Sequence, residues 1–109
     1  MQTGKIRNEM TLRSGLEIPT EKIAEICQRY GIQEMAIFGS AARDDMRPDS
    51  DVDVMVEFFP GVVHGWEYFH LEEELAAAFG RKVDMATKKW IKPRLKSRIL
   101  SEARVVYEA

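Results

Sequence analysis

Two apolar segments with strand-like alternation, joined by a polar loop, occupy residues 35–58 and constrain the fold more than any other feature. The first runs into Gly39-Ser40, and the second opens with Asp51-Val52-Asp53. Because successive side chains along a strand point to opposite faces, Asp51 and Asp53 share one face of the second segment. The opposite face is entirely apolar, which predicts a core there: Val52, Val54, Val56 and Phe58.

The paired carboxylates Asp51 and Asp53 predict a cation site. Two carboxylates at the start of one strand repel each other unless a cation lies between them. Mg²⁺ is usually held by one or two carboxylates together with the phosphates of a substrate, so it is the cation we expect here.

Gly39 and the residues after it have the properties of a phosphate-binding turn. A glycine lets the backbone come close to a ligand. We predict that Ser40 caps a short helix through residues 41–43, whose free N–H groups and dipole favour an anion. Arg43 adds a positive charge one turn further on. A phosphate site and a metal site separated by one loop indicate chemistry on a nucleotide with Mg²⁺.

The spacing of these residues resembles a known signature. Gly39-Ser40, ten further residues and then Asp51-x-Asp53 is similar to the motif of the nucleotidyltransferase fold in the DNA polymerase beta superfamily. The runs 38–43 and 50–53 most resemble the minimal nucleotidyltransferase (MNT) domain. The resemblance covers residues 20–109 and leaves residues 1–19 as an extended lead-in. It implies an α+β fold, with a small mixed β-sheet and helices packed on one face.

The resemblance also implies roles for particular residues. A third carboxylate is expected beside the first two, on a strand predicted over residues 81–86, and Asp84 occupies that place. An aspartate in an otherwise apolar strand is costly unless it faces a cation or water, although a structural ion pair is the alternative. Two Mg²⁺ ions and ATP are the implied cofactors. The implied catalytic and metal-binding residues are Asp51, Asp53 and Asp84, and the nucleotide-binding residues are Gly39, Ser40 and Arg43.

Proteins of the MNT family act as antitoxins paired with a HEPN-domain ribonuclease toxin, and they transfer AMP from ATP to a tyrosine hydroxyl of that toxin. The resemblance therefore implies a protein partner that brings the acceptor. Two alternatives stay open. One is nucleotidyl transfer to a small molecule or an RNA end with a separate substrate-binding subunit. The other is stoichiometric masking of the toxin without catalysis.

Composition and charge limit the number of domains, the binding partners and the cellular compartment that we expect. At 109 residues we expect one domain with a single core. The net charge is −2, although residues 81–98 hold eight Lys and Arg against one Asp, which predicts a local basic patch and no nucleic-acid binding by the chain alone. No apolar run approaches the roughly 18 residues of a membrane span, residues 1–8 show no signal sequence, and Cys27 is the single cysteine. A cytoplasmic protein is expected.

Helical spacing predicts helices over residues 20–30, 66–79 and 93–104, and residues 105–107 are expected to form a short final strand or a packed tail. Several side chains in and around these segments allow a structural and a functional interpretation, and the structural one is our prediction. On the structural interpretation, Cys27 is a buried hydrophobic residue and Glu57 is a solvated residue at the end of a strand. His64 and His70 bind no metal. The expected core residues are Trp66, Tyr68 and Phe69. For Lys88 and Lys89, contact with phosphate and simple solvation both stay open.

Overall fold

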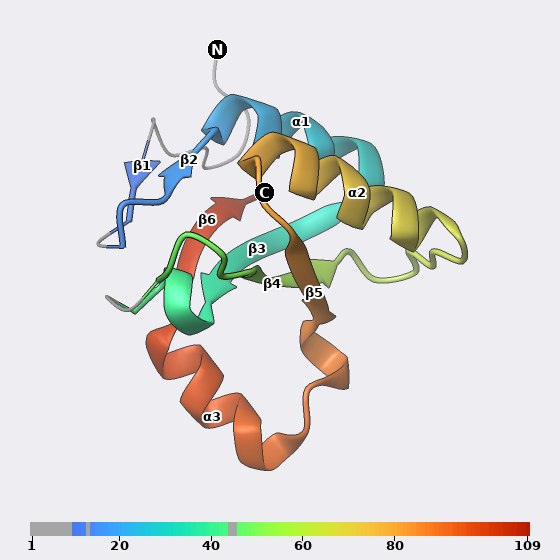
Figure 1. The fold of residues 1–109 in the computed structure, drawn as a ribbon. Helices are drawn as coiled ribbons and strands as arrows, with labels where there is room; N and C mark the ends of the chain where they lie inside the picture. The colour runs from blue at the N-terminus through green and yellow to red at the C-terminus, as the bar shows by residue number, and fades with distance from the viewer. Residues whose placement is uncertain (1–9, 13, 44–45) are drawn as a thin grey trace.

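A four-stranded sheet in the order β5-β4-β3-β6 lies at the centre of the computed structural model, which describes residues 10–12, 14–43 and 46–109 (Figure 1). β3 pairs antiparallel with both β4 and β6, whereas β4 and β5 are parallel, so the sheet is mixed. The strands are β3 (Ile32–Phe38), β4 (Val52–Phe58), β5 (Val83–Thr87) and β6 (Arg104–Glu108).

Two of the three helices in the described residues cover one face of this sheet. α1 (Thr20–Tyr30) and α2 (Glu67–Phe79) lie side by side over it, while α3 (Pro93–Glu102) lies on the other side (Figure 1). Two short 3₁₀ turns, η1 (Gly39–Ala41) and η2 (Lys88–Trp90), follow β3 and β5. The α+β class and the mixed sheet predicted from the sequence are confirmed, and α3 is the helix that stands apart from the helical layer.

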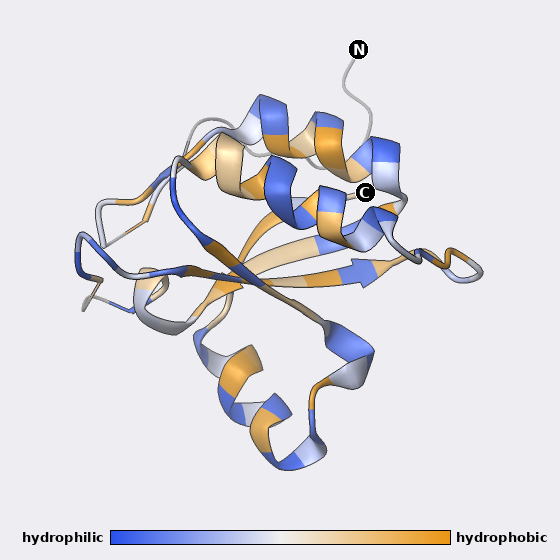
Figure 2. Cartoon of the chain, turned by 45° about the vertical axis from the view of Figure 1, so that its right-hand side comes forward, coloured by the Kyte–Doolittle hydropathy of each residue, from blue (hydrophilic) through white to orange (hydrophobic). Residues whose placement is uncertain are grey.

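The core fills the space between the sheet and the α1–α2 layer. The apolar face predicted for β4 is confirmed at Val52, Val54 and Val56, which are fully buried, while Met55 on the opposite face is buried as well. Figure 2 shows hydrophobic residues along the central strands beneath these two helices. Burial of apolar area is the main favourable term in folding, so this layer fixes which face of β4 is left for polar residues. The helices contribute apolar stripes of fully buried residues: Ile23, Ile26, Cys27, Leu71 and Leu75.

A small hairpin before α1 was not anticipated from the sequence. β1 (Met10–Thr11) pairs antiparallel with β2 (Glu17–Ile18). Leu12, Leu16 and Ile18 are buried in the common core. The predicted lead-in therefore contains a packed segment, while residues 1–9 and 13 lie outside the described residues. The boundary at residue 20 stays a prediction.

Some apolar side chains assigned to the core are exposed. Trp66 and Phe69 are 68% and 69% exposed, so the prediction that they are core residues is wrong, whereas Tyr68 is partly buried against the core. Pro93 occupies the first turn of α3 as predicted, but α3 buries none of its residues. Helical periodicity shows that a helix has an apolar side, and it does not show whether the same chain covers that side.

Cys27 and the two histidines have structural surroundings. Burial raises the pKa of Cys27 to about 12, so its thiol stays protonated at neutral pH. Nε2 of His64 lies 2.6 Å from the carbonyl oxygen of Tyr30, and Nδ1 of His70 lies 3.7 Å from Oε1 of Glu73 on the same helix.

Within the described residues, no helix combines the length and the apolar character that crossing a bilayer requires.

The packing of the hairpin can be tested by Leu16→Ala. Because Leu16 is buried in the core, we expect the substitution to lower the free energy of unfolding by about 2–5 kcal/mol, measured by urea denaturation. Leu95→Ala is the matched control, since Leu95 is 43% exposed on α3, and a change within about 0.5 kcal/mol is expected there. Equal stability of both variants and the unchanged protein would mean that the hairpin does not contribute to the core.

Candidate active site

The sheet register brings the predicted carboxylates together on β4 and β5. Asp53 is the register partner of Phe38 on β3 and of Asp84 on β5. Asp51 precedes Asp53 by two residues, and both are partly buried, whereas Asp84 is exposed. All three lie at the end of the sheet where β3 ends and β4 and β5 begin. Asp84 was predicted beside the pair, and the structure places it beside Asp53.

Asp53 has an electrostatically unfavourable position in this cluster. Burial raises the pKa of Asp53 above its ordinary value, the negative charges of Asp84 and Asp51 raise it further, and Arg43 opposes the shift. Each neighbouring carboxylate therefore disfavours the ionised form of Asp53, and a bound cation would relieve that repulsion. The donor set is all oxygen, which suits Mg²⁺. Across residues 10–12, 14–43 and 46–109, no three or more potential ligands are already gathered as a metal cluster.

Gly39 fits its position for two separate reasons. Its φ of 72° lies in the left-handed region that favours glycine. A Cβ atom at Gly39 would overlap Oδ2 of Asp53 and lie 3.0 Å from its Cγ. The absence of a side chain at this residue therefore provides the space for the Asp53 carboxylate.

The turn after Gly39 differs from the predicted one in its cap. The N-cap of η1 is Phe38, which makes no capping side-chain hydrogen bond, so the prediction that Ser40 caps this turn is wrong. The N–H groups of Ala42 and Arg43 donate to the carbonyl of Gly39 at 3.1 and 3.0 Å, which closes the turn. From the β1–β2 hairpin, Oγ of Ser14 donates to the carbonyl of Ala41 at 2.7 Å and supports the same turn.

Glu102, the last residue of α3, reaches this turn and was not identified from the sequence. Its Oε1 accepts the N–H of Gly39 at 3.2 Å. Nη1 of Arg43 donates to Oε1 at 3.2 Å and to Oε2 at 3.3 Å. A contact between residues 63 positions apart leaves no local signal in a sequence.

Arg81 is a second residue that sequence analysis missed as part of this region. Its Nη1 donates to the carbonyls of Arg47, Pro48 and Ser50 at 3.0–3.1 Å. Ser50 closes the same loop, because its Oγ accepts the N–H of Arg47 at 2.9 Å, as a turn serine does. Arg81 thus joins the start of β5, where Asp84 lies, to the loop that leads into Asp51.

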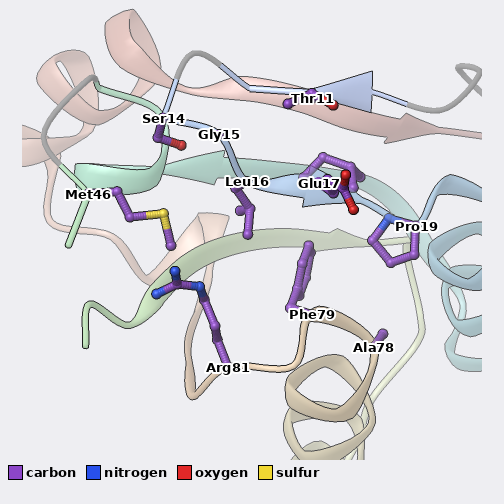
Figure 3. A pocket seen from close by; sticks show the side chains of 11 residues that line it. Thr11, Ser14, Gly15, Leu16, Glu17, Pro19, Met46, Ala78, Phe79 and Arg81 are labelled. Carbon is purple, nitrogen blue, oxygen red and sulfur yellow. The ribbon is translucent and has the colours of Figure 1, made fainter. Parts of the chain in front are cut away.

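Arg81 also lines a pocket of about 520 Å³ between the β1–β2 hairpin and the C-terminal end of α2 (Figure 3). Figure 3 shows Arg81 and Met46 on one side of this pocket and Glu17 and Pro19 on the other. The lining includes none of the six predicted site residues. We therefore place the candidate active site at the carboxylate cluster and not in this pocket.

Lys88 and Glu57 contact each other away from the cluster. Nζ of Lys88 lies 3.6 Å from Oε1 of Glu57 and 3.5 Å from Oε1 of Glu34. Lys88 follows the C-terminal end of β5, whereas Asp84 is near its beginning, so the two lie at opposite ends of the strand. These contacts give Glu57 and Lys88 a structural ion-pair role at that end of the sheet.

The chain matches the family model of the nucleotidyltransferase domain over residues 20–106, and it therefore belongs to this family. It is a nucleotidyltransferase, as the resemblance implied. Among individual relatives, it is 35% identical to the protein adenylyltransferase MntA of Thermococcus cleftensis, over 90% of this chain and 96% of the relative.

Two solved structures show the same fold. A toxin–antitoxin crystal structure with AMP-PNP aligns with a TM-score of 0.68 at 19% identity, over 82% of this chain and 73% of the other. A complex of tri-AMPylated Shewanella oneidensis HEPN toxin with its MNT antitoxin aligns with a TM-score of 0.60 at 18% identity, over 82% of this chain and 69% of the other.

The role of Gly39 can be tested against Gly80, the C-cap of α2. Gly80 has a similar φ of 67°, and a Cβ there would meet no atom within 4 Å. Both Gly→Ala substitutions impose a backbone cost of about 1–2 kcal/mol, but only Gly39→Ala pushes against Asp53. We expect Gly39→Ala to lower nucleotidyl transfer about 100-fold or more, and Gly80→Ala to leave the rate of the folded protein unchanged. Equal rates in the two variants would contradict this role for Gly39.

The raised pKa of Asp53, due to burial and to the neighbouring carboxylates, predicts a pH-dependent gain in stability for Asp53→Asn. Because the pKa of Asp53 is raised on folding, its ionised form destabilises the fold, and this loss sets in as pH rises from 3.8 through the raised pKa. In buffer containing EDTA, Asp53→Asn is therefore expected to raise the melting temperature at pH 7, and the gain should shrink as pH approaches 4. Asp49→Asn, at an exposed loop residue, is the control. A gain that is independent of pH would contradict the electrostatic explanation.

Proposed function

We propose that this chain is the antitoxin of a toxin–antitoxin pair and transfers AMP from ATP to a tyrosine hydroxyl of a HEPN-domain toxin. Its 35% identity to a protein adenylyltransferase over nearly the full length of both chains supports protein AMPylation. The fold is shared with antitoxins solved in toxin–antitoxin complexes, one of them holding an AMPylated HEPN toxin. Such a reaction uses the ATP of the cytoplasm, which is where we place it.

The observation that carries the proposal is the register of β4 between its neighbours. It sets Asp53 next to Asp84 on one side and against Gly39 at the end of β3 on the other. A pair of carboxylates beside a glycine whose backbone has no side chain in the way suits the binding of a triphosphate with its metal ions. The exposed position of Asp84 leaves it accessible to an acceptor hydroxyl.

Asp51, Asp53 and Asp84 would hold two Mg²⁺ ions in this proposal. When bound, the ions neutralise charge on the α-phosphate and on the pyrophosphate leaving group. The raised pKa of Asp53, caused first by burial and then by the charges of Asp84 and Asp51, supports this assignment, because a divalent cation would stabilise its ionised form.

The protein groups supply positioning and proton transfer. The N–H of Gly39, the hydroxyl of Ser40 and the guanidinium of Arg43 bind and orient the β- and γ-phosphates. Asp84 accepts the proton of the tyrosine hydroxyl while the phenolic oxygen bonds to the α-phosphorus. The bond from the α-phosphorus to the bridging oxygen breaks, and pyrophosphate leaves. Most of the rate gain comes from orientation and charge stabilisation.

Masking of the toxin is the second candidate, and exposed apolar side chains favour a protein partner for either function. Trp90 is 76% exposed, and Leu95 and Leu100 are 43% and 42% exposed on the neighbouring helix. Where such side chains form one contiguous patch, the patch is typical of an interaction site. A masking protein neutralises its toxin by contact alone and does not need intact carboxylates.

The test is incubation of the chain with its toxin, Mg²⁺ and α-labelled ATP, followed by intact mass of both proteins. We expect the toxin to gain one or more AMP units, and Asp53→Asn to abolish the gain while still forming the complex. Asp49→Asn is the matched control, since it makes the same chemical change at an exposed loop residue, and it should retain activity. A complex that neutralises the toxin with no mass change would reject AMPylation in favour of masking. Mapping the modified peptide identifies the acceptor residue.

A further inference from the structure

The carboxylate of Glu102 lies in the place that the phosphate assignment needs. It contacts the two donors assigned to phosphate, the N–H of Gly39 at 3.2 Å and the guanidinium of Arg43 at 3.2 and 3.3 Å. The Glu102 side chain is 21% exposed and its bond to Gly39 is partly buried, whereas Arg43 on the other side of the contact is 44% exposed. A carboxylate held by a backbone N–H and an arginine has the same recognition chemistry as a phosphate oxygen.

Glu102 and a phosphate cannot use the N–H of Gly39 together. A backbone amide has one hydrogen to donate, so a phosphate oxygen that accepts it must replace Oε1 of Glu102. Arg43 has five donors and can bind both groups, but the carboxylate and the phosphate would then repel each other at short range. The N–H of Gly39 is therefore bonded either to Glu102 or to a phosphate, and not to both.

We infer that Glu102 is an internal occupant of the phosphate site, which the triphosphate of ATP must displace, and that it sets the affinity of the site for polyphosphates. The inference rests on the proposed function, because it takes Gly39 and Arg43 as the phosphate-binding groups.

Displacement of Glu102 also has an effect on α3. Glu102 is the last residue of that helix, and α3 buries none of its residues. The bonds from Glu102 to Gly39 and Arg43 hold the C-terminal end of α3 against the turn after β3. A bound triphosphate therefore releases this attachment, so occupancy of the nucleotide site and the position of α3 are coupled.

The test is the affinity of Glu102→Gln for ATP and for inorganic pyrophosphate, both with Mg²⁺, by isothermal titration calorimetry. Gln keeps the shape of the side chain and removes the competing charge. We expect both ligands to bind about tenfold more tightly than to the unchanged protein. Glu57→Gln is the control for overall charge, since Glu57 lies on β4 and pairs with Lys88 at the other end of the sheet. It should leave both affinities unchanged.

Unchanged or weaker binding in Glu102→Gln would overturn the inference, as would an equal gain in Glu57→Gln. Absence of ATP binding to all three proteins would reject the phosphate assignment itself, and with it the proposed function.

An independent readout follows the N–H of Gly39 by NMR in ¹⁵N-labelled protein. In the unchanged protein, we expect pyrophosphate to shift this resonance as the bond to Glu102 is exchanged for one to phosphate. In Glu102→Gln without ligand, the resonance should already differ from that of the unchanged protein. A Gly39 signal that responds to neither the substitution nor pyrophosphate would contradict the contact.

Discussion

The pairing of β4 with a strand on each side is the constraint on which the candidate site depends. One side of β4 sets Asp53 against the end of β3 at Gly39, and the other sets it beside Asp84. Hydrogen bonds along both edges fix the register, and a shift by one residue would turn every β4 side chain to the opposite face. The chemistry at Asp53 is therefore set by backbone pairing as much as by the side chains themselves.

Packing on one face of β4 provides the free energy that holds unfavourable charges together on the other. Burial and the neighbouring carboxylates raise the pKa of Asp53, so its ionised form opposes folding. Val52, Val54 and Val56 are fully buried under α1 and α2 and keep the strand in place. Functional sites commonly combine such local electrostatic cost with support from the surrounding core.

Much of this arrangement could be predicted from the sequence because its signals are local. Alternation along residues 52–58 predicted both faces of β4, and the spacing from Gly39 to Asp53 predicted the family. Asp84 could be placed because it interrupts an apolar strand. In each case the signal is a pattern within one short segment of the chain.

The contacts that escaped prediction are long-range or belong to very short elements. Glu102 and Arg81 act on partners far away in the sequence, and neither residue breaks a local pattern. The β1–β2 hairpin consists of two-residue strands, which are too short for alternation to be visible. Trp66 and Phe69 were assigned to the core because apolar character indicates burial on average, but both side chains are turned outward at the start of α2.

The separation of Glu102 from Gly39 along the chain also bears on how the protein is made. Synthesis proceeds from the N-terminus, so β3, its turn and β4 emerge well before the end of α3. A nascent chain therefore presents the N–H of Gly39 and the guanidinium of Arg43 before the carboxylate of Glu102 exists. During that interval Gly39 and Arg43, the groups proposed to bind phosphate, lack the carboxylate that contacts them in the folded chain.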